Sequence, residues 1–350
     1  MITLSADGIS LTFDPDLGLI EEFCVTDGET DISPLHRAPW VGMGETLPDD
    51  IAPHLVRLGG DFFCAPFAST EGASPPHGWP PNSAWVIREK TATSLRAELG
   101  KTVFGARLEK EITLYDGHPF VYQRHTFFGG QGRLPVSNHA NLSLPNGGLI
   151  RTSPKSCWRT PPIALEVDAT RGRSGLRYPA QSETPTSFPA VSGSVDLTRY
   201  PWFSRCEDFV VGLDAPGAEI GWTAVTRPQE GDVFLSLKPS RILPMTMLWH
   251  SNGGRDYPPW SGRHFGCLGI EEGAAATVLG EDVDADWPAS GLVTLVPDGR
   301  VAVTHVIGAF RWPGGTAIDS VSPFQDHLVI RDYKGADIKL PFDPGLLRTA

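Results

Sequence analysis

Residues 134–144 read Leu-Pro-Val-Ser-Asn-His-Ala-Asn-Leu-Ser-Leu, a strand pattern that carries one histidine between two asparagines. An imidazole gives and takes a proton near neutral pH, so His139 is a candidate proton carrier. A single histidine in a β-rich chain is more often a structural residue. Two other segments favour a catalytic role for His139: a turn at His77-Gly78, and the acidic pair Glu271-Glu272 that follows the apolar residues 267–270. Active sites are commonly assembled from such distant segments.

Strand and turn signals fill the rest of the chain. It has 350 residues with 38 glycines and 32 prolines, yet 40% of its residues are hydrophobic. Asp-Gly pairs at 7–8, 27–28, 116–117 and 298–299 lie between short apolar runs, which favours hairpins. Strand patterns occupy 9–13, 85–88, 94–98, 108–115, 120–128, 234–238, 292–296, 301–307 and 327–332. Since no helical pattern of 12 residues is free of proline and glycine, we predict an all-β fold.

The segment from about 154 to 200 is rich in Pro, Ser, Thr, Gly and Arg and predicts a long irregular excursion between two β-rich halves. We expect one continuous domain over residues 1–350, because strands on both sides of the excursion carry candidate site residues. A domain boundary near the excursion is the alternative. No repeat of 20 to 50 residues indicates a propeller or solenoid.

Charge and cysteine usage restrict the partners. A net charge of −12 without any run of Lys or Arg argues against nucleic acid and anionic membranes. The five cysteines are widely spaced without a Cys-x-x-Cys pair, which disfavours a disulfide framework or a zinc knuckle and predicts reduced, mostly buried thiols. The N-terminus has no secretory pattern, and no apolar run approaches the roughly 20 residues of a membrane helix. We therefore expect a cytoplasmic protein without metal or cofactor, which could form a homodimer.

Tryptophan is abundant, with 10 residues in the chain. Aromatic faces stack on the apolar C–H faces of sugar rings, while carboxylates, amides and imidazoles bond the hydroxyls at the ring edges. Trp249 stands out because His250 and Asn252 follow it into a glycine turn at 253–254. This grouping suggests a carbohydrate pocket.

Taken together, these segments resemble the aldose 1-epimerases, or galactose mutarotase-like proteins. The resemblance rests on 134–142, on Pro-His-Gly-Trp at 76–79, and on Gly-Cys-Leu-Gly-Ile-Glu at 266–271, which occur in family order over roughly residues 1 to 300. It implies a β-supersandwich of two large, mostly antiparallel sheets, with a sugar site in an open cleft on the concave sheet. The partner would be a small-molecule sugar.

The resemblance also implies roles for single residues. Glu271 would be the general base that removes the proton from the O1 hydroxyl, and His139 the general acid that protonates the ring oxygen. The family's sugar-binding aspartate falls near residues 206–209. The candidate substrate-binding residues are His77, Asn138, Trp249, Glu207 and Asp208.

Several alternatives stay open at this stage. Glu272 competes with Glu271 as the base, although strand alternation sends only one of them into the cleft. The family's Asn-Arg pair before the His-Gly segment is absent, so a non-catalytic carbohydrate-binding or sugar-sensing protein is the second hypothesis. A polysaccharide lyase or glycosidase is the third. A sugar phosphate could be the ligand because arginines stand near the candidate segments, at Arg57, Arg124, Arg133 and Arg151.

Overall fold

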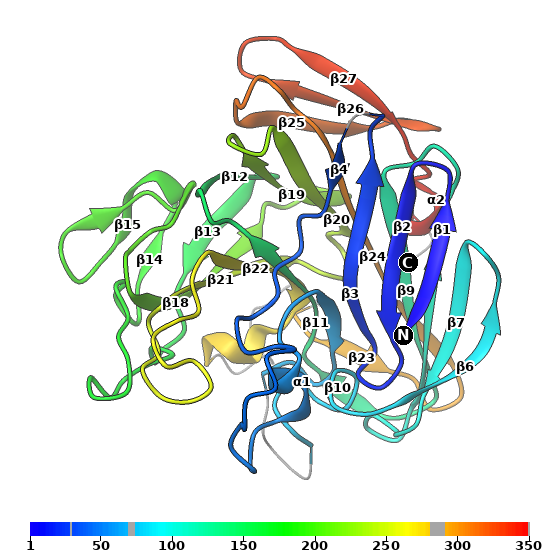
Figure 1. Ribbon diagram of the computed structural model, residues 1–350, viewed down its shortest axis with the longest axis horizontal. Helices are drawn as coiled ribbons and strands as arrows, with labels where there is room; N and C mark the ends of the chain where they lie inside the picture. The colour runs from blue at the N-terminus through cyan, green and yellow to red at the C-terminus, as the bar shows by residue number, and fades with distance from the viewer. Residues whose placement is uncertain (29, 69–73, 281–290, 349–350) are drawn as a thin grey trace.

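Two large sheets form the body of the chain in the computed structural model, which describes residues 1–350 except 29, 69–73, 281–290 and 349–350 (Figure 1). The eleven-stranded sheet runs in the order β1 (Ile2–Ala6), β2 (Ile9–Asp14), β3 (Leu19–Thr26), β5 (Asp61–Cys64), β11 (Val136–Ser143), β22 (Cys267–Ala274), β21 (Met245–Asn252), β18 (Cys206–Asp214), β13 (Lys155–Arg159) and β14 (Gln181–Ser182), with β4 (Asp31–Ile32) paired to β3. The nine-stranded sheet runs in the order β17 (Arg199–Tyr200), β12 (Gly148–Thr152), β19 (Ile220–Arg227), β20 (Asp232–Pro239), β24 (Arg300–Arg311), β9 (Phe120–Phe128), β8 (Arg107–Thr113), β7 (Ser94–Leu99) and β6 (Trp85–Lys90).

Smaller elements complete the chain. Two two-stranded sheets are formed by β10 (Gly132–Leu134) with β23 (Val293–Leu295) and by β15 (Phe188–Pro189) with β16 (Ser194–Val195). A three-stranded sheet near the C-terminus contains β25 (Ile318–Pro323), β26 (His327–Asp332) and β27 (Asp337–Pro341), and packs through Ile318 and Leu328 against Trp222 and Phe310. The helical segments are short: α1 (Pro53–Val56), α2 (Gly345–Arg348), and the 3-10 turns η1 (Pro185–Ser187) and η2 (Ala276–Leu279).

The period of two along each strand divides the eleven-stranded sheet into two faces. One face packs on the nine-stranded sheet, where Leu248 and Ile270 share a buried cluster with Phe234 and Ile307. We call it the interior face. The opposite face, which we call the outer face, carries a second apolar cluster that includes Phe62, Phe209 and Trp249, covered by Trp40 and Trp260 from loops. Neighbouring residues on one strand therefore point to opposite faces of the sheet, one into the sandwich interior and the next into the outer cluster.

The structure confirms the all-β fold and the sandwich of two large antiparallel sheets. Strands predicted at 120–128 and 327–332 have those bounds, and Asp7-Gly8 joins β1 to β2 as a two-residue hairpin between Ala6 and Ile9. The turn at 298–299 does not make a hairpin, because β23 pairs with β10 while β24 pairs with β9 and β20. A turn signal fixes a local reversal of the chain, whereas tertiary packing chooses the partner of each strand.

The irregular excursion belongs to both sheets. Its β13 and β14 extend the eleven-stranded sheet, and its β17 forms an edge of the nine-stranded sheet. That it forms one domain with the rest of the chain stays a prediction. No disulfide forms among the described residues; Cys64 and Cys267 are fully buried, and the other three cysteines are only partly so. No helix in the described part of the chain is long and apolar enough to cross a membrane.

Candidate active site

His139 and Glu271 face each other on adjacent strands of the eleven-stranded sheet. The antiparallel register of β11 and β22 pairs these two residues directly, and His139 Nε2 lies 3.1 Å from Glu271 Oε1. Their exposed fractions are 4% and 2%. Gly269 leaves room for the pair, because a Cβ there would lie 3.1 Å from Glu271 Oε1 and 3.2 Å from His139 Cε1. An acid and a base predicted from separate segments are thus brought into contact.

Aromatic rings fix the orientation of the His139 imidazole. Phe62, its register partner on β5, stacks on it with ring centroids 4.6 Å apart. Trp249 on β21 meets the imidazole edge to face at 5.9 Å, and His77 does the same at 5.6 Å. Since these rings crowd the imidazole from several sides, packing contributes to its orientation toward Glu271.

The turn at residues 77–78 needs its glycine. His77 and Gly78 both have left-handed backbone, with φ of 66° and 74°. A Cβ at residue 78 would lie 2.0 Å from the carbonyl oxygen of Ala65, which pairs with Gly78 in a β-bridge. Asn82 closes the turn, because its Nδ2 donates to the carbonyl oxygen of Gly78 at 2.7 Å. The backbone of this turn therefore requires glycine at residue 78, and the turn positions the His77 imidazole.

A second histidine is tied to the same turn. The Asn82 Oδ1 accepts hydrogen bonds from the backbone N–H of His54 at 3.0 Å and from its Nδ1 at 2.9 Å. His54 lies on α1, and its ring meets that of His77 edge to face at 5.1 Å. Burial lowers the pKa of His54 to about 4, so its imidazole is neutral at physiological pH.

These groups line a cavity of about 360 Å³ on the outer face. Four of the predicted site residues, His77, His139, Trp249 and Glu271, contribute to its wall. The rest of the lining is mostly apolar and comes from α1, from the strands, from 161–165 of the irregular excursion and from loops: His54, Leu55, Leu58, Phe62, Phe67, Ala68, Pro76, Pro161, Ile163, Leu165, Phe209, Arg255, Trp260 and Val278. Such a volume is suited to a small molecule.

Arg255 is a cavity residue that sequence reasoning missed. It follows the Gly253-Gly254 turn, and a Cβ at residue 254 would lie 2.2 Å from the Cys206 carbonyl carbon. Its Nε donates to Glu166 Oε1 at 2.6 Å, and its Nη1 lies 3.4 Å from Glu207 Oε1. The two carboxylates hold the guanidinium at the wall. The four arginines considered for a phosphate clamp do not line this cavity: Arg57, Arg124, Arg133 and Arg151.

Glu207 supports the cavity from behind and does not line it. It accepts hydrogen bonds from Trp249 Nε1 at 2.5 Å and from Ser251 Oγ at 3.0 Å. Burial raises the pKa of Glu207 to about 7, against the opposing effect of Arg255 and these donors. The predicted direct contact of Glu207 with substrate is replaced by a positioning contact with Trp249 and Arg255.

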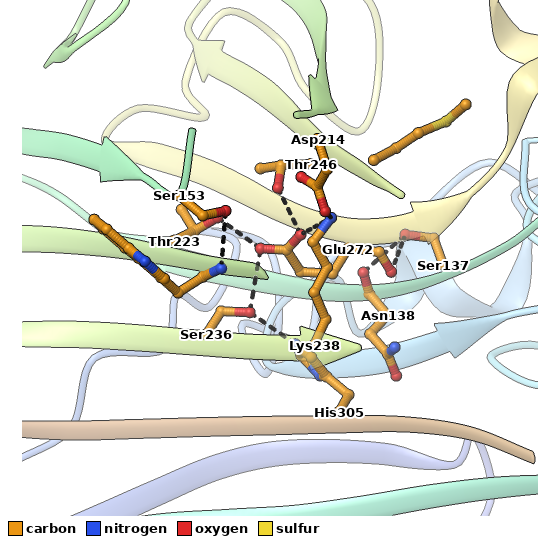
Figure 2. A network of polar contacts seen from close by, with 12 residues as sticks. Ser137, Asn138, Ser153, Asp214, Thr223, Ser236, Lys238, Thr246, Glu272 and His305 are labelled. Carbon is orange, nitrogen blue, oxygen red and sulfur yellow. Dashed lines mark hydrogen bonds and ion pairs between the residues drawn. The ribbon is translucent and has the colours of Figure 1, made fainter. Parts of the chain in front are cut away.

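Glu272 points the other way, into the interior of the sandwich (Figure 2). Its carboxylate accepts hydrogen bonds from Thr223 Oγ1 at 2.6 Å and Thr246 Oγ1 at 2.7 Å, and Lys238 Nζ lies 3.2 Å away. Burial alone would raise the pKa of Glu272, but Lys238, Lys155 and the two threonine hydroxyls bring it below its usual value. Of the two adjacent glutamates, only Glu271 faces the cavity.

Asn138 and Asp208 are corrections to the predicted site. Asn138 pairs with Glu272 in the β11–β22 register and lies on the interior face (Figure 2). Asp208 accepts hydrogen bonds from the backbone N–H groups of Gly175 and Leu176 and from the Tyr178 hydroxyl, so it anchors the irregular excursion. Each is the strand neighbour of an outer-face residue, and alternation turns it away from the cavity.

Burial shifts the acid–base pair toward its uncharged form. It raises the pKa of Glu271 well above its usual value, and it lowers the pKa of His139 to about 3, with a smaller contribution from His54. The favoured state of the pair is thus a neutral carboxyl, which holds one proton, beside a neutral imidazole. Transfer of that proton from Glu271 to His139 creates a carboxylate and an imidazolium without any change of net charge.

Several buried polar atoms at this site lack a hydrogen-bond partner among the described residues. They are Glu271 Oε2, His139 Nδ1 and His77 Nδ1. Buried polar groups in folded proteins are nearly always satisfied by protein, water or ligand. Because the three atoms belong to residues that line one cavity, the cavity is suited to a polar ligand.

Solved structures with this fold include epimerases, although no family model and no curated protein matches the sequence. A protein of Escherichia coli K12 whose proposed activity is aldose 1-epimerase has a TM-score of 0.59 and 16% identity, covering 88% of this chain and 98% of its own. A galactose mutarotase related enzyme of Lactobacillus acidophilus has a TM-score of 0.53 and 12% identity, covering 88% and 97%. A galactose 1-epimerase of the same species has a TM-score of 0.51 and 13% identity, covering 89% and 94%. The resemblance stated from the sequence is confirmed as a shared fold.

Proposed function

We propose that the chain is an aldose 1-epimerase-like enzyme that interconverts the anomers of an aldose or a related sugar. The observation that carries the proposal is the buried His139–Glu271 pair, which has unsatisfied polar atoms and lines a cavity sized for a small molecule. The shared fold with proteins described as epimerases supports it. A fold hosts many activities, so the site has to carry the argument.

The proposed reaction needs one base and one acid, which act on the two oxygens bonded to C1 of the sugar. Glu271 takes the proton from the O1 hydroxyl while His139 gives a proton to the ring oxygen, and the bond between C1 and the ring oxygen breaks. Rotation about C1–C2 in the open aldehyde, followed by closure with the same groups in reverse, inverts the anomer. Because O1 and the ring oxygen are both bonded to C1, two groups in mutual contact can serve both atoms.

Burial acts oppositely on the two sides of the ring-opening step. Before the step the pair is a carboxylate and an imidazolium, and after it both groups are neutral. Desolvation disfavours the charged forms, as the raised pKa of Glu271 and the lowered pKa of His139 indicate. The same burial disfavours the charged pair from which ring opening starts and favours the neutral pair that it produces, so the transfer of a proton from Glu271 to His139 has to precede the step.

The walls favour a sugar with an apolar part. Trp249 and Phe209 can cover a C–H face of the ring, while His77 and Arg255 can bond hydroxyls. Most other wall residues are aliphatic or aromatic, and a hydroxyl buried without a partner costs about 1 to 3 kcal/mol. We therefore propose a deoxy sugar or a sugar with an apolar substituent as the preferred substrate, above a fully hydroxylated hexose.

Magnetisation-exchange NMR of anomer equilibration tests the proposal on a panel of neutral hexoses, deoxyhexoses and O-alkylated, acidic and phosphorylated sugars. The wild-type chain should accelerate exchange of at least one sugar, and Glu271→Gln should lose about 10² to 10⁴ of that rate while still binding the sugar in a thermal-shift assay. Full activity of Glu271→Gln would show that the base is assigned wrongly. Binding without acceleration by the wild type would instead favour the sugar-binding alternative.

A further inference from the structure

A cluster of two histidines and a cysteine lies behind the cavity wall. His36 comes from the loop after β4, His264 from the loop between β21 and β22, and Cys267 is the first residue of β22. The two Nε2 atoms are 3.1 Å apart, and the three potential ligand atoms all lie within 4.8 Å of one another. The exposed fractions of the three residues are 8%, 1% and 0%. None of the three lines the proposed active-site cavity.

Hydrogen bonds prepare His264 as a ligand. When Glu207 is ionised, Ser251 Oγ donates to its Oε2 at 3.0 Å, so the same hydroxyl oxygen accepts the proton of His264 Nδ1 at 2.7 Å. The Nε2 of His264 then carries a lone pair that points at His36. Metal-binding histidines usually have such a hydrogen bond from the second ring nitrogen to a carboxylate or another acceptor, which fixes the tautomer.

We propose that His36, His264 and Cys267 bind a zinc-type transition-metal ion, with both histidines coordinating through Nε2 and the cysteine through a thiolate. Imidazole and thiolate are the ligand types that such ions prefer. In a tetrahedral zinc site, bond lengths of about 2.0 to 2.3 Å place neighbouring ligand atoms roughly 3.3 to 3.5 Å apart. The two histidine nitrogens are already near that separation, and the sulfur lies within 4.8 Å of both.

An unsatisfied amide oxygen and a second cavity lie near the cluster. Asn141 lies on the same face of the sheet as Cys267, its carbonyl oxygen accepts the His36 N–H at 2.8 Å, and its buried Oδ1 has no hydrogen-bond partner among the described residues. A cavity of about 240 Å³ reaches His36 and has Glu21 and Glu22 in its wall. Arg37 and Arg57 stand in the same wall, so the cavity carries charges of both signs.

The ion would join three segments that are distant in sequence. His264 stands at the end of the loop that carries Arg255 and Trp260 into the active-site cavity, and its ring packs against Trp249 at 5.8 Å and Trp260 at 5.0 Å. A metal ion there acts as a structural cross-link between this loop, β22 and the N-terminal loop. Because bound metal is released on unfolding, binding adds to the stability of the fold.

Metal loading of the full chain tests the proposal. The protein is treated with a chelator, dialysed, and titrated at pH 8 with Zn²⁺ or Co²⁺; bound metal is measured by mass spectrometry and the cobalt–thiolate absorption band by spectroscopy. We expect one ion per chain, the thiolate band, and a higher melting temperature with Zn²⁺. Cys267→Ser should abolish the band, and Ser251→Ala should weaken Zn²⁺ binding by about 10- to 100-fold.

Cys64→Ser is the matched control, because Cys64 is an equally buried thiol of the same sheet outside the cluster. It should keep both the stoichiometry and the band. The proposal is overturned if the wild type binds less than one tight ion per chain, or if His36→Asn and Cys267→Ser, shown to be folded by circular dichroism, bind Zn²⁺ and Co²⁺ as the wild type does. Neither readout depends on sugar turnover, so the result is separate from that of the proposed function.

Discussion

His139 Nε2 and Glu271 Oε1 lie 3.1 Å apart because the register of β11 and β22 places the two residues directly opposite each other. The spacing of the proposed acid and base is thus set by backbone hydrogen bonds of two central strands and not by a flexible loop. Sites built on strands hold their geometry better than sites built on loops. Of the groups proposed to bind the sugar, His77 and Arg255 come from loops, whereas Trp249 and Phe209 lie on β21 and β18.

Glu271→Gln and Glu272→Gln should have opposite effects, since the two carboxylates serve different faces of one strand. The first should lose activity and keep its stability, because the side chain remains neutral and of similar shape. The second removes a partner of Lys238 in the interior and should cost about 3 kcal/mol of unfolding free energy. Urea denaturation and NMR exchange rates per folded molecule measure the two effects. Equal loss of activity in both variants would contradict the assignment.

The pH profile of kcat/KM should be a broad plateau. The pair is active while it shares one proton, so activity falls only below the pKa of His139, which burial lowers to about 3, and above the raised pKa of Glu271. A solvent-exposed pair would instead have its acid limb near pH 4.5 and its alkaline limb near pH 6.5, the ordinary values of the two groups. Rates corrected for buffer catalysis distinguish the two profiles, and limbs at those ordinary values would argue against a desolvated pair.

Gly78→Ala should impair both folding and sugar turnover. The new Cβ would collide with the Ala65 carbonyl oxygen and push the 77–78 turn away, and His77 with it. Gly117→Ala is the matched control, because Gly117 has nearly the same φ, 73°, and nothing within 4 Å of the added Cβ. The control should lose only the roughly 1 to 2 kcal/mol of left-handed strain and keep kcat/KM. Similar kinetics for both variants would mean that the turn does not position His77.

Arg255→Lys should weaken substrate binding more than it slows chemistry. A lysine ammonium is a point charge and cannot reproduce the two contacts of the guanidinium with Glu166 and Glu207. We expect a rise of about tenfold in KM, equivalent to 1.4 kcal/mol, with a much smaller change in kcat. Arg173→Lys, at a surface ion pair with Asp256, is the control that should change neither. A fall in kcat alone would show that Arg255 acts in the chemical step and not in substrate binding.

The sequence predicted the fold class well, because alternating apolar residues and glycine turns specify strands locally. It also indicated the outer-face residues His139 and Glu271, but it named their neighbours too. Asn138 could have been excluded by alternation, since it cannot share a face with His139. Arg255 could not have been placed, because it stands beyond a glycine turn whose path is set by close packing against Cys206. The His36–His264 contact joins residues 228 positions apart, and no local sequence pattern predicts it.

The adjacency of Glu271 and Glu272 also constrains how this strand can change in evolution. A substitution on β22 changes a side chain on only one face of the sheet. An insertion or deletion of one residue before residue 271 would instead turn each following side chain to the opposite face, and would move a carboxylate of the interior network into the cavity. Length variation among homologous chains should therefore avoid β22 and collect in the loops that surround the cavity.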